Sequence, residues 1–173
     1  MIRRAILFTA ALALGIAVGC TRPPPPVPAK PVELRSITVD QYEEEIAKHK
    51  GKVVLVDVWF LDCSPCRQKF PEFVQLHNEL GTEGLVCISV DIRSDEVKRK
   101  DEVLDFLKEK GADTINLIFD DSRTQLERWF QKHNVQYTPE TIVYNRRGER
   151  VPASDPADKE SMSRFLKDLL AEK

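Results

Sequence analysis

The chain has 173 residues, of which 42% are hydrophobic and 31% are charged, and its formal net charge is −2. This balance fits one globular domain with short appendages. A slightly acidic balance offers no electrostatic attraction for nucleic acid, so we expect no partner of that class. The sequence divides into three parts, with predicted bounds at residues 1–19, 20–33 and 34–173.

The first 19 residues have the pattern of a secretory signal peptide. Arg3 and Arg4 form a short basic head, and an apolar run from Ala5 to Gly19 follows them. The run ends in small residues and is too short to span a membrane comfortably. This segment therefore predicts an extracytoplasmic protein.

Cys20 follows this run directly. The stretch LGIAVGC resembles the lipobox of bacterial lipoproteins, in which the cysteine receives a lipid and becomes the mature N-terminus. The resemblance implies that Cys20 attaches the protein to a lipid membrane. The usual leucine three residues before the cysteine is Ala17 here, and Ala17 to Gly19 would also suit ordinary signal peptidase. A soluble secreted protein is therefore the alternative.

A proline-rich segment, TRPPPPVPAKPVE, runs from Thr21 to Glu33. It has no apolar periodicity, and its composition favours an extended polyproline conformation. Such a segment is more commonly a spacer than a ligand for a proline-binding domain. We therefore expect a tether that holds the folded domain away from a membrane surface.

The remaining residues, 34–173, alternate between helical and extended patterns. In chain order we expect a helix at 38–50, a strand at 52–60, a helix from about 63 to 80, a strand at 85–92, a helix at 101–111, a strand at 114–120, a helix at 122–134, a hairpin of strands at 141–145 and 149–152, and a helix around 162–170. This order predicts an α/β domain with a central mixed sheet flanked by helices on both sides.

Two of these elements have especially clear patterns. The β-branched run at 52–60 is typical of a central strand covered on both faces. Met162, Phe165 and Leu169 follow the helical spacing closely. By contrast, the charged run from Ser94 to Lys110 is expected to be a solvated helix face.

Two cysteines flank Ser64 and Pro65 at the junction of a predicted strand and helix. A bridge between Cys63 and Cys66 would close so small a loop that it would constrain the unfolded chain little, so stability is a poor reason for it. The helix start places free N–H groups and the positive end of the helix dipole at Cys63, which favours its thiolate. The pattern therefore predicts a redox disulfide, with Cys63 as nucleophile and Cys66 as resolving thiol.

A metal site is the second interpretation of the cysteine pair. Zinc usually needs four ligands, and the other candidates in the domain are Cys87 and three histidines, without a second closely spaced pair. Some copper chaperones use two cysteines and one distant histidine, and here His133 would have to be that histidine. Cys87 is expected to be a buried, inert residue. We predict no metal and no cofactor, and keep a copper-binding chaperone and a redox-inert binding scaffold as alternatives.

The stretch VVLVDVWFLDCSPCRQKFP, residues 53–71, resembles the thioredoxin family. It has Asp57 six residues before Cys63, then Trp59, the Cys-x-Pro-Cys core, and Pro71 eight residues after Cys63. The resemblance implies a thioredoxin-like fold for the domain and thiol-disulfide exchange at the cysteines.

A second stretch, NVQYTPETIVYNRRGE, resembles the other signature of that family, a cis proline before a strand and a Gly hairpin. This implies a cis bond between Thr138 and Pro139. The chain also has an extra helix between the strands at 85–92 and 114–120, and it has the lipoprotein-like leader. Together these features resemble the TlpA/ResA branch of membrane-tethered thiol-disulfide oxidoreductases.

The resemblance implies roles for further residues. Asp57 would lie beneath Cys66, with a pKa raised by its apolar strand, and would accept the Cys66 proton and return it. Thr138 and Pro139 would bind an extended substrate segment beside the sulfurs. Trp59 is expected mainly to pack, with a secondary part in shaping the substrate site.

The same branch implies partners and a direction of electron flow. The substrate would be a disulfide-containing protein, a membrane thiol protein would donate electrons, and cytochrome c maturation is the commonest task. Pro65 removes an N–H that could face the Cys63 sulfur, and Asp62 adds a negative charge next to it. Both disfavour the thiolate, so we predict a reductant.

Overall fold

The computed structural model describes residues 30–152 and 158–172. The predicted signal peptide, Cys20 and most of the tether lie outside the described residues. Val32 already packs against the core, and Leu34 is buried. Contacts with the domain therefore begin slightly before the predicted boundary at residue 34.

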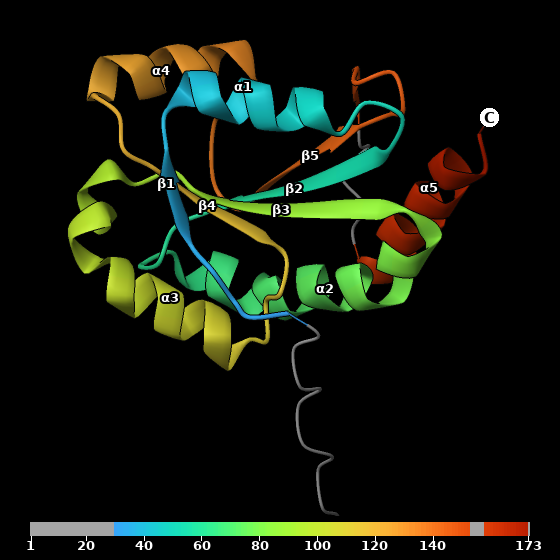
Figure 1. Cartoon of the computed structure of the whole chain (residues 1–173), viewed down its shortest axis with the longest axis horizontal. Helices are drawn as coiled ribbons and strands as arrows, with labels where there is room; N and C mark the ends of the chain where they lie inside the picture. Colours follow the sequence, from blue (N-terminus) through green and yellow to red (C-terminus); the bar gives the residue numbers. More distant parts are fainter. Residues whose placement is uncertain (1–29, 153–157, 173) are drawn as a thin grey trace, which may run out of the picture.

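A six-stranded mixed sheet forms the centre of the domain (Figure 1). In spatial order its strands are β1 (Arg35–Ile37), β4 (Ile115–Phe119), β3 (Leu85–Asp91), β2 (Val53–Trp59), β5 (Glu140–Tyr144) and β6 (Arg150–Val151). The first four are parallel to one another, β5 pairs antiparallel with β2, and β6 pairs antiparallel with β5. This arrangement confirms the predicted mixed sheet and its hairpin.

Helices cover both faces of this sheet. They are α1 (Val39–Lys48), α2 (Ser64–Leu80), α3 (Lys100–Glu109), α4 (Arg123–Lys132) and α5 (Lys159–Ala171), with the short 3-10 helices η1 (Gly81–Glu83) and η2 (Ser94–Arg99). Figure 1 shows α1 and α4 on one face, α2 and α3 on the other, and α5 beside the end of α2. Within residues 30–152 and 158–172, no helix has the length and apolar character needed to cross a membrane.

The side chains of β2 alternate between two hydrophobic cores. The even-numbered residues, from Val54 to Val58, pack in the core beneath α1 and α4. Val53, Leu55 and Trp59 pack in the core formed with α2, α3 and α5. Successive side chains of a strand point to opposite faces, so Asp57 lies on the α2 side of the sheet. Burial on both faces explains the continuous β-branched run in this strand.

Side-chain caps fix the starts of two helices on the other face. The Thr38 hydroxyl accepts a hydrogen bond from the N–H of Gln41, and the Gln41 side chain accepts one from the N–H of Thr38. Ser122 and Gln125 make the same reciprocal pair at the start of α4. Both are capping boxes, which satisfy N–H groups that have no partner inside the helix.

Two elements differ from the sequence-based expectation. β1 is not predicted, because only Ile37 of its three residues is buried, and its partner β4 lies far along the chain. The charged run that starts at Ser94 is not one solvated helix. It begins as η2, and its Glu96 is 1% exposed. The prediction of a solvated face is therefore wrong for η2, since one of its carboxylates points into the protein.

Candidate active site

The end of β2 and the start of α2 position the two cysteines. A turn joins these elements, in which the N–H of Cys63 donates to the carbonyl of Phe60 at 3.1 Å. Cys63 is the N-cap of α2, and its Sγ accepts a hydrogen bond from the N–H of Cys66 at 3.2 Å. Pro65 suits the first helical turn, where an N–H has no partner inside the helix. The structure confirms the predicted helix start at Cys63.

Cys63 and Cys66 form a disulfide, and their Cα atoms are 5.3 Å apart. The exposed fraction is 6% for Cys63 and 1% for Cys66. The two residues between them, Ser64 and Pro65, are exposed. Cys63 is therefore the more exposed of the two residues, as expected for the cysteine that attacks first.

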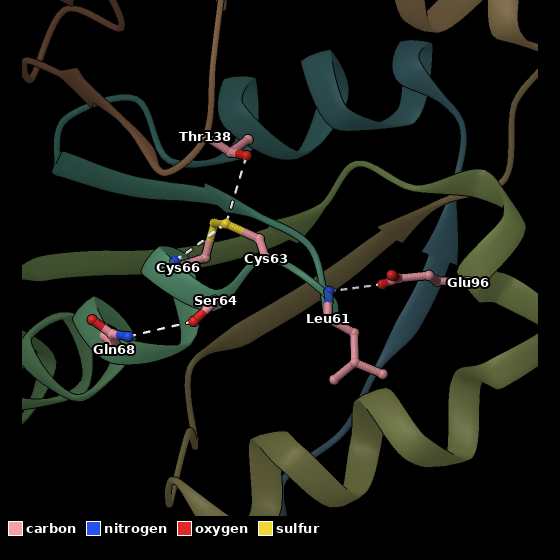
Figure 2. The surroundings of a disulfide bond; sticks show 7 residues. All are labelled: Leu61, Cys63, Ser64, Cys66, Gln68, Glu96 and Thr138. Atoms are coloured by element: carbon pink, nitrogen blue, oxygen red, sulfur yellow. Dashed lines mark hydrogen bonds between the residues drawn. A yellow bond between two sulfur atoms is a disulfide. The ribbon is translucent and has the colours of Figure 1, made fainter.

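Thr138 lies against this disulfide, far from it in sequence (Figure 2). Its hydroxyl donates to the Sγ of Cys63 at 3.7 Å. β5 runs antiparallel to β2 with Glu140 opposite Val58, so the segment before β5 meets the segment after β2. The bond between Thr138 and Pro139 is cis, as the resemblance implies. The sheet register therefore brings the two sequence motifs together.

Asp57 is a buried carboxyl group on the same side of the sheet as the cysteines. Its exposed fraction is 8%. Burial raises the pKa of Asp57 to about 7, and the positive charge of Lys69 opposes that rise. A carboxyl group with such a pKa can both accept and release a proton near neutral pH.

A cavity of about 460 Å³ lies next to Pro65, one of the two residues between the cysteines, and reaches Asp57. Pro65 from the first motif and Pro139 from the second both line it. Tyr137 also lines the cavity. Its exposed fraction is 67%, which is high for a large hydrophobic residue. The cavity therefore gives Asp57 a route to solvent.

The structure corrects the prediction that Trp59 helps to bind substrate. Its side chain has no exposed surface. The indole packs on Phe70 and Phe106, with ring centroids 5.0 and 5.1 Å away. A side chain without exposed surface has no face to offer a substrate, so Trp59 serves packing, the first of its two predicted roles.

The predicted effect of Asp62 also needs correction. The Asp62 side chain is 60% exposed and pairs with the guanidinium of Arg99 at 2.7 Å. The hydrogen bond from Arg99 lowers the pKa of Asp62. In the sequence this carboxylate has no visible partner and counts as an isolated negative charge beside Cys63. The nearby Arg99 offsets much of that charge.

His133 is engaged on the opposite face of the sheet from the cysteines. Its Nε2 lies 2.7 Å from the carboxylate of Glu43, and its Nδ1 lies 3.3 Å from the hydroxyl of Tyr144. Cys87 is buried, and burial raises the pKa of its thiol. Among the described residues, no group of three or more metal-binding side chains could hold an ion. Beside Cys63 and Cys66, the part of the chain that the structure describes therefore offers the copper-site alternative no third ligand.

Two residues that contact the turn before Cys63 were not predicted from the sequence. Glu96 accepts a hydrogen bond from the N–H of Leu61, and Arg99 pairs with the side chain next to it in the turn. Both belong to η2, inside a run of charges that has no apolar periodicity. No local pattern distinguishes the buried Glu96 from its exposed neighbours, because its partner lies 35 positions earlier.

Comparison with known proteins agrees with this arrangement. Residues 27–149, more than half of the chain, match the model of the AhpC/TSA family. The chain belongs to the AhpC/TSA family. This family member is 25% identical over 118 residues to the thiol-disulfide oxidoreductase ResA of Bacillus subtilis (strain 168). The aligned part is 68% of the chain and 61% of ResA, so the chain spans less than two thirds of that relative.

Solved structures of similar shape confirm the thioredoxin-like fold of this AhpC/TSA member. One is the thioredoxin domain of a thiol-disulfide oxidoreductase from Bacteroides vulgatus, with a TM-score of 0.60, 18% identity, and coverage of 72% of this chain and 83% of that one. Another is a thioredoxin-family thiol:disulfide interchange protein from Chlorobium tepidum, with a TM-score of 0.54, 24% identity, and coverage of 72% and 83%. A third is a secreted Mycobacterium tuberculosis disulfide oxidoreductase homologous to E. coli DsbE, with a TM-score of 0.54, 17% identity, and coverage of 70% and 85%.

Proposed function

We propose that this chain is an extracytoplasmic thiol-disulfide oxidoreductase that reduces disulfide bonds in protein substrates. The observation that carries the proposal is the Cys63–Cys66 disulfide at the start of α2, where the Cys63 sulfur meets the N–H of Cys66 and the hydroxyl of Thr138. A helix start and such hydrogen bonds favour a thiolate. The similarity to ResA, which is named as a thiol-disulfide oxidoreductase, supports the same activity.

In the first step the reduced protein attacks through Cys63. Its thiolate bonds to one sulfur of the substrate disulfide, the substrate S–S bond breaks, and the other substrate sulfur leaves as a thiolate. Thr138 and Pro139 present their main chain to the substrate segment. The contact between Thr138 and the Cys63 sulfur supports this role, because a residue that touches this sulfur also borders whatever is bonded to it.

In the second step Cys66 releases the product. Its thiol gives a proton to Asp57, and the Cys66 sulfur then attacks Cys63. The mixed disulfide breaks, the Cys63–Cys66 disulfide forms, and the substrate leaves with both of its sulfurs reduced. The position of Asp57 on the α2 side of the sheet and its pKa of about 7 support this proton transfer.

We infer that electrons flow outward to the substrate. Pro65 supplies no N–H to stabilise the Cys63 thiolate, which favours a reducing couple. The contribution of Asp62 to that preference is smaller than the sequence indicates, because Arg99 pairs with it. Redox titration against a dithiothreitol or glutathione series measures the potential directly. A potential as high as that of an oxidising foldase contradicts this direction.

The proposed setting is the outer side of a membrane. The signal-like residues 1–19 and the lipobox resemblance around Cys20 support attachment through a lipid. A membrane thiol protein would re-reduce the Cys63–Cys66 disulfide, and apocytochrome c is the proposed substrate, as the TlpA/ResA resemblance implies. The name of the secreted Mycobacterium tuberculosis neighbour supports an extracytoplasmic location.

Reduction of insulin by the wild type and three variants tests the activity. Cys63→Ser should abolish turnover, and Cys66→Ala should stall with the substrate bonded to Cys63, where mass spectrometry can identify it. Cys87→Ala is the matched control and should retain turnover, because Cys87 is a buried free thiol. Equal activity of Cys63→Ser and the wild type contradicts the proposed function.

A further inference from the structure

The segment η2 contributes a buried carboxylate to the turn before Cys63. Glu96 is 1% exposed, and its Oε2 accepts a hydrogen bond from the N–H of Leu61 at 2.8 Å (Figure 2). Leu61 follows Phe60, whose carbonyl accepts the N–H of Cys63 and closes the turn. A buried carboxylate is stable only with such partners, and a charge-assisted hydrogen bond is among the strongest.

Asp91, the last residue of β3, supports Glu96 from the other side. It is wholly buried, and its Oδ1 accepts a hydrogen bond from the N–H of Arg93 at 2.9 Å. Its Oδ2 and the Oε1 of Glu96 are also buried, and neither oxygen can donate unless a carboxyl group is protonated. Burial and a hydrogen bond with Glu96 raise the pKa of Asp91 well above its usual range. Asp91 therefore favours its protonated form beside Glu96.

Ile92, which follows β3, and Arg99 of η2 each make one more contact with this turn. The N–H of Ile92 donates to the carbonyl of Trp59 at 3.1 Å, and Arg99 pairs with Asp62. Together with the hydrogen bond to Leu61, these contacts hold the chain on both sides of Phe60 and immediately before Cys63. The turn is thus supported from outside by β3 and η2, in addition to its own hydrogen bond.

We infer that Glu96 is a positioning residue for Cys63. Backed by Asp91, its carboxylate fixes Leu61 and so keeps the Cys63 sulfur at the N–H of Cys66. A thiolate formed at that place is stabilised by the N–H, whereas a turn free to shift would lose this hydrogen bond for part of the time. The inference rests on the proposed function, because the sulfur concerned is the proposed nucleophile.

The test is the pH profile of Cys63 alkylation by iodoacetamide in the reduced full-length chain, measured on the Cys63 peptide by mass spectrometry. Glu96→Ala should slow alkylation at pH 7 by roughly two- to tenfold, the range of one net hydrogen bond. Glu96→Gln should stay within about twofold of the wild type, since its amide oxygen can accept from Leu61 and its amide nitrogen can donate to Asp91. Asp105→Ala removes an exposed carboxylate of α3 and should change nothing.

Two outcomes overturn the inference. One is a folded Glu96→Ala variant with the wild-type profile, and the other is a Glu96→Gln variant that loses as much as Glu96→Ala. If Glu96→Ala does not fold, hydrogen exchange at the backbone amide of Leu61 in the wild type tests the inference instead. A Leu61 amide as slow as those of β2 supports the inference, and a Leu61 amide that exchanges like an exposed one overturns it. Alkylation needs no substrate, so its result is independent of whether the wild type reduces insulin.

Discussion

Asp57 combines burial with access to solvent through the cavity next to Pro65. The protonated carboxyl group is stable on the apolar side of β2, whereas ionising it there costs free energy because the charge is buried. The proposed second step uses this property, because an acid with a pKa of about 7 takes a proton from Cys66 and returns it to solvent near neutral pH.

Asp57→Asn should slow the release of substrate from the mixed disulfide by roughly a hundredfold, because it removes the acceptor proposed for the Cys66 proton. The pH profile of that step should also lose its inflection near pH 7. Single-turnover kinetics between about pH 5.5 and 8.5 measure both. Lys69→Gln is the matched variant, and it should move the inflection to higher pH, since the Lys69 charge lowers the pKa of Asp57. An unchanged profile in Asp57→Asn contradicts the role.

The same substitution should change stability in a pH-dependent way. The pKa of Asp57 is raised from its ordinary 3.8 to about 7, so the folded state holds a proton that the unfolded state has lost. The free energy of unfolding therefore falls as the pH rises from about 4 to 7, and this contribution is constant above that. Urea unfolding of Asp57→Asn should show a flatter pH dependence and a gain of a few kcal/mol at pH 8. An equal effect at pH 4 and pH 8 would mean that the carboxyl group does not titrate as described.

Asp62→Asn should have a small effect on Cys63. The paired carboxylate is exposed, and solvent and salt screen surface ion pairs so that they contribute little. We expect the pKa of the Cys63 thiol to fall by less than about half a unit, whereas Arg99→Gln should raise it by leaving Asp62 unpaired. Site-resolved alkylation measures both variants. A fall of a full unit in Asp62→Asn would restore the stronger role predicted from the sequence.

The sequence reveals the residues of the site that lie within a local motif. Cys63, Cys66 and the motif around Pro139 can be found because each sits in a short pattern with a physical reason. The environment of these residues could not be predicted in the same way. Glu96 and Arg99 act on the turn from a segment more than 30 positions away, and whether a carboxylate in a charged run is buried depends on packing alone.

At the scale of elements, α3 supports the site from behind through an aromatic cluster. Phe106 of α3 packs on Trp59 at the end of β2 and on Phe70 in α2, with centroids 5.1 and 5.2 Å away. The three rings join the strand that carries Asp57 to the helix that carries Cys66. Their packing therefore links the stability of α3 to the geometry of the disulfide.

Phe106→Ala should lower the free energy of unfolding by about 3–5 kcal/mol, because it removes a buried ring from this cluster. Urea denaturation measures the loss. Lys108→Ala, on the exposed surface of the same helix, is the control and should cost less than about 0.5 kcal/mol. A similar loss in both variants would show that the helix contributes through its backbone and not through the aromatic contact.

Periodic elements could be predicted from the sequence, and elements held by distant partners could not. The helices and the strands β2 to β6 match the expected order, since each has its own apolar pattern. β1 has three residues and depends on pairing with β4. η2 has no apolar stripe, so its pattern resembles that of a solvated surface although its Glu96 is buried.

For the whole molecule, the proposed attachment to a membrane depends on Cys20. Cys20→Ser should move the protein from the membrane fraction to the soluble fraction of the cells that export it, since the substitution removes the acceptor of the lipid. Cell fractionation followed by immunoblotting measures the distribution. Insulin reduction by the soluble variant should equal that of the wild type, because Cys20 precedes the domain. A wild type found wholly in the soluble fraction supports the secreted alternative.

The parallel pairing of β1 gives the domain two distinct poles. β1 to β4 all run in the same direction, so the chain enters the domain at one end of the sheet and Cys63 lies beyond the other. A domain hanging straight from Cys20 would thus turn its cysteines away from the bilayer, toward soluble substrates. To meet a membrane donor, the domain would have to rotate so that its cysteines face the membrane. The proposed tether, residues 21–31, would allow this rotation if it were extended, because it would then span about 34 Å at about 3.1 Å per residue. A shorter tether should therefore slow the re-reduction of the Cys63–Cys66 disulfide by a membrane donor. A protein that is already reduced should still reduce one substrate disulfide.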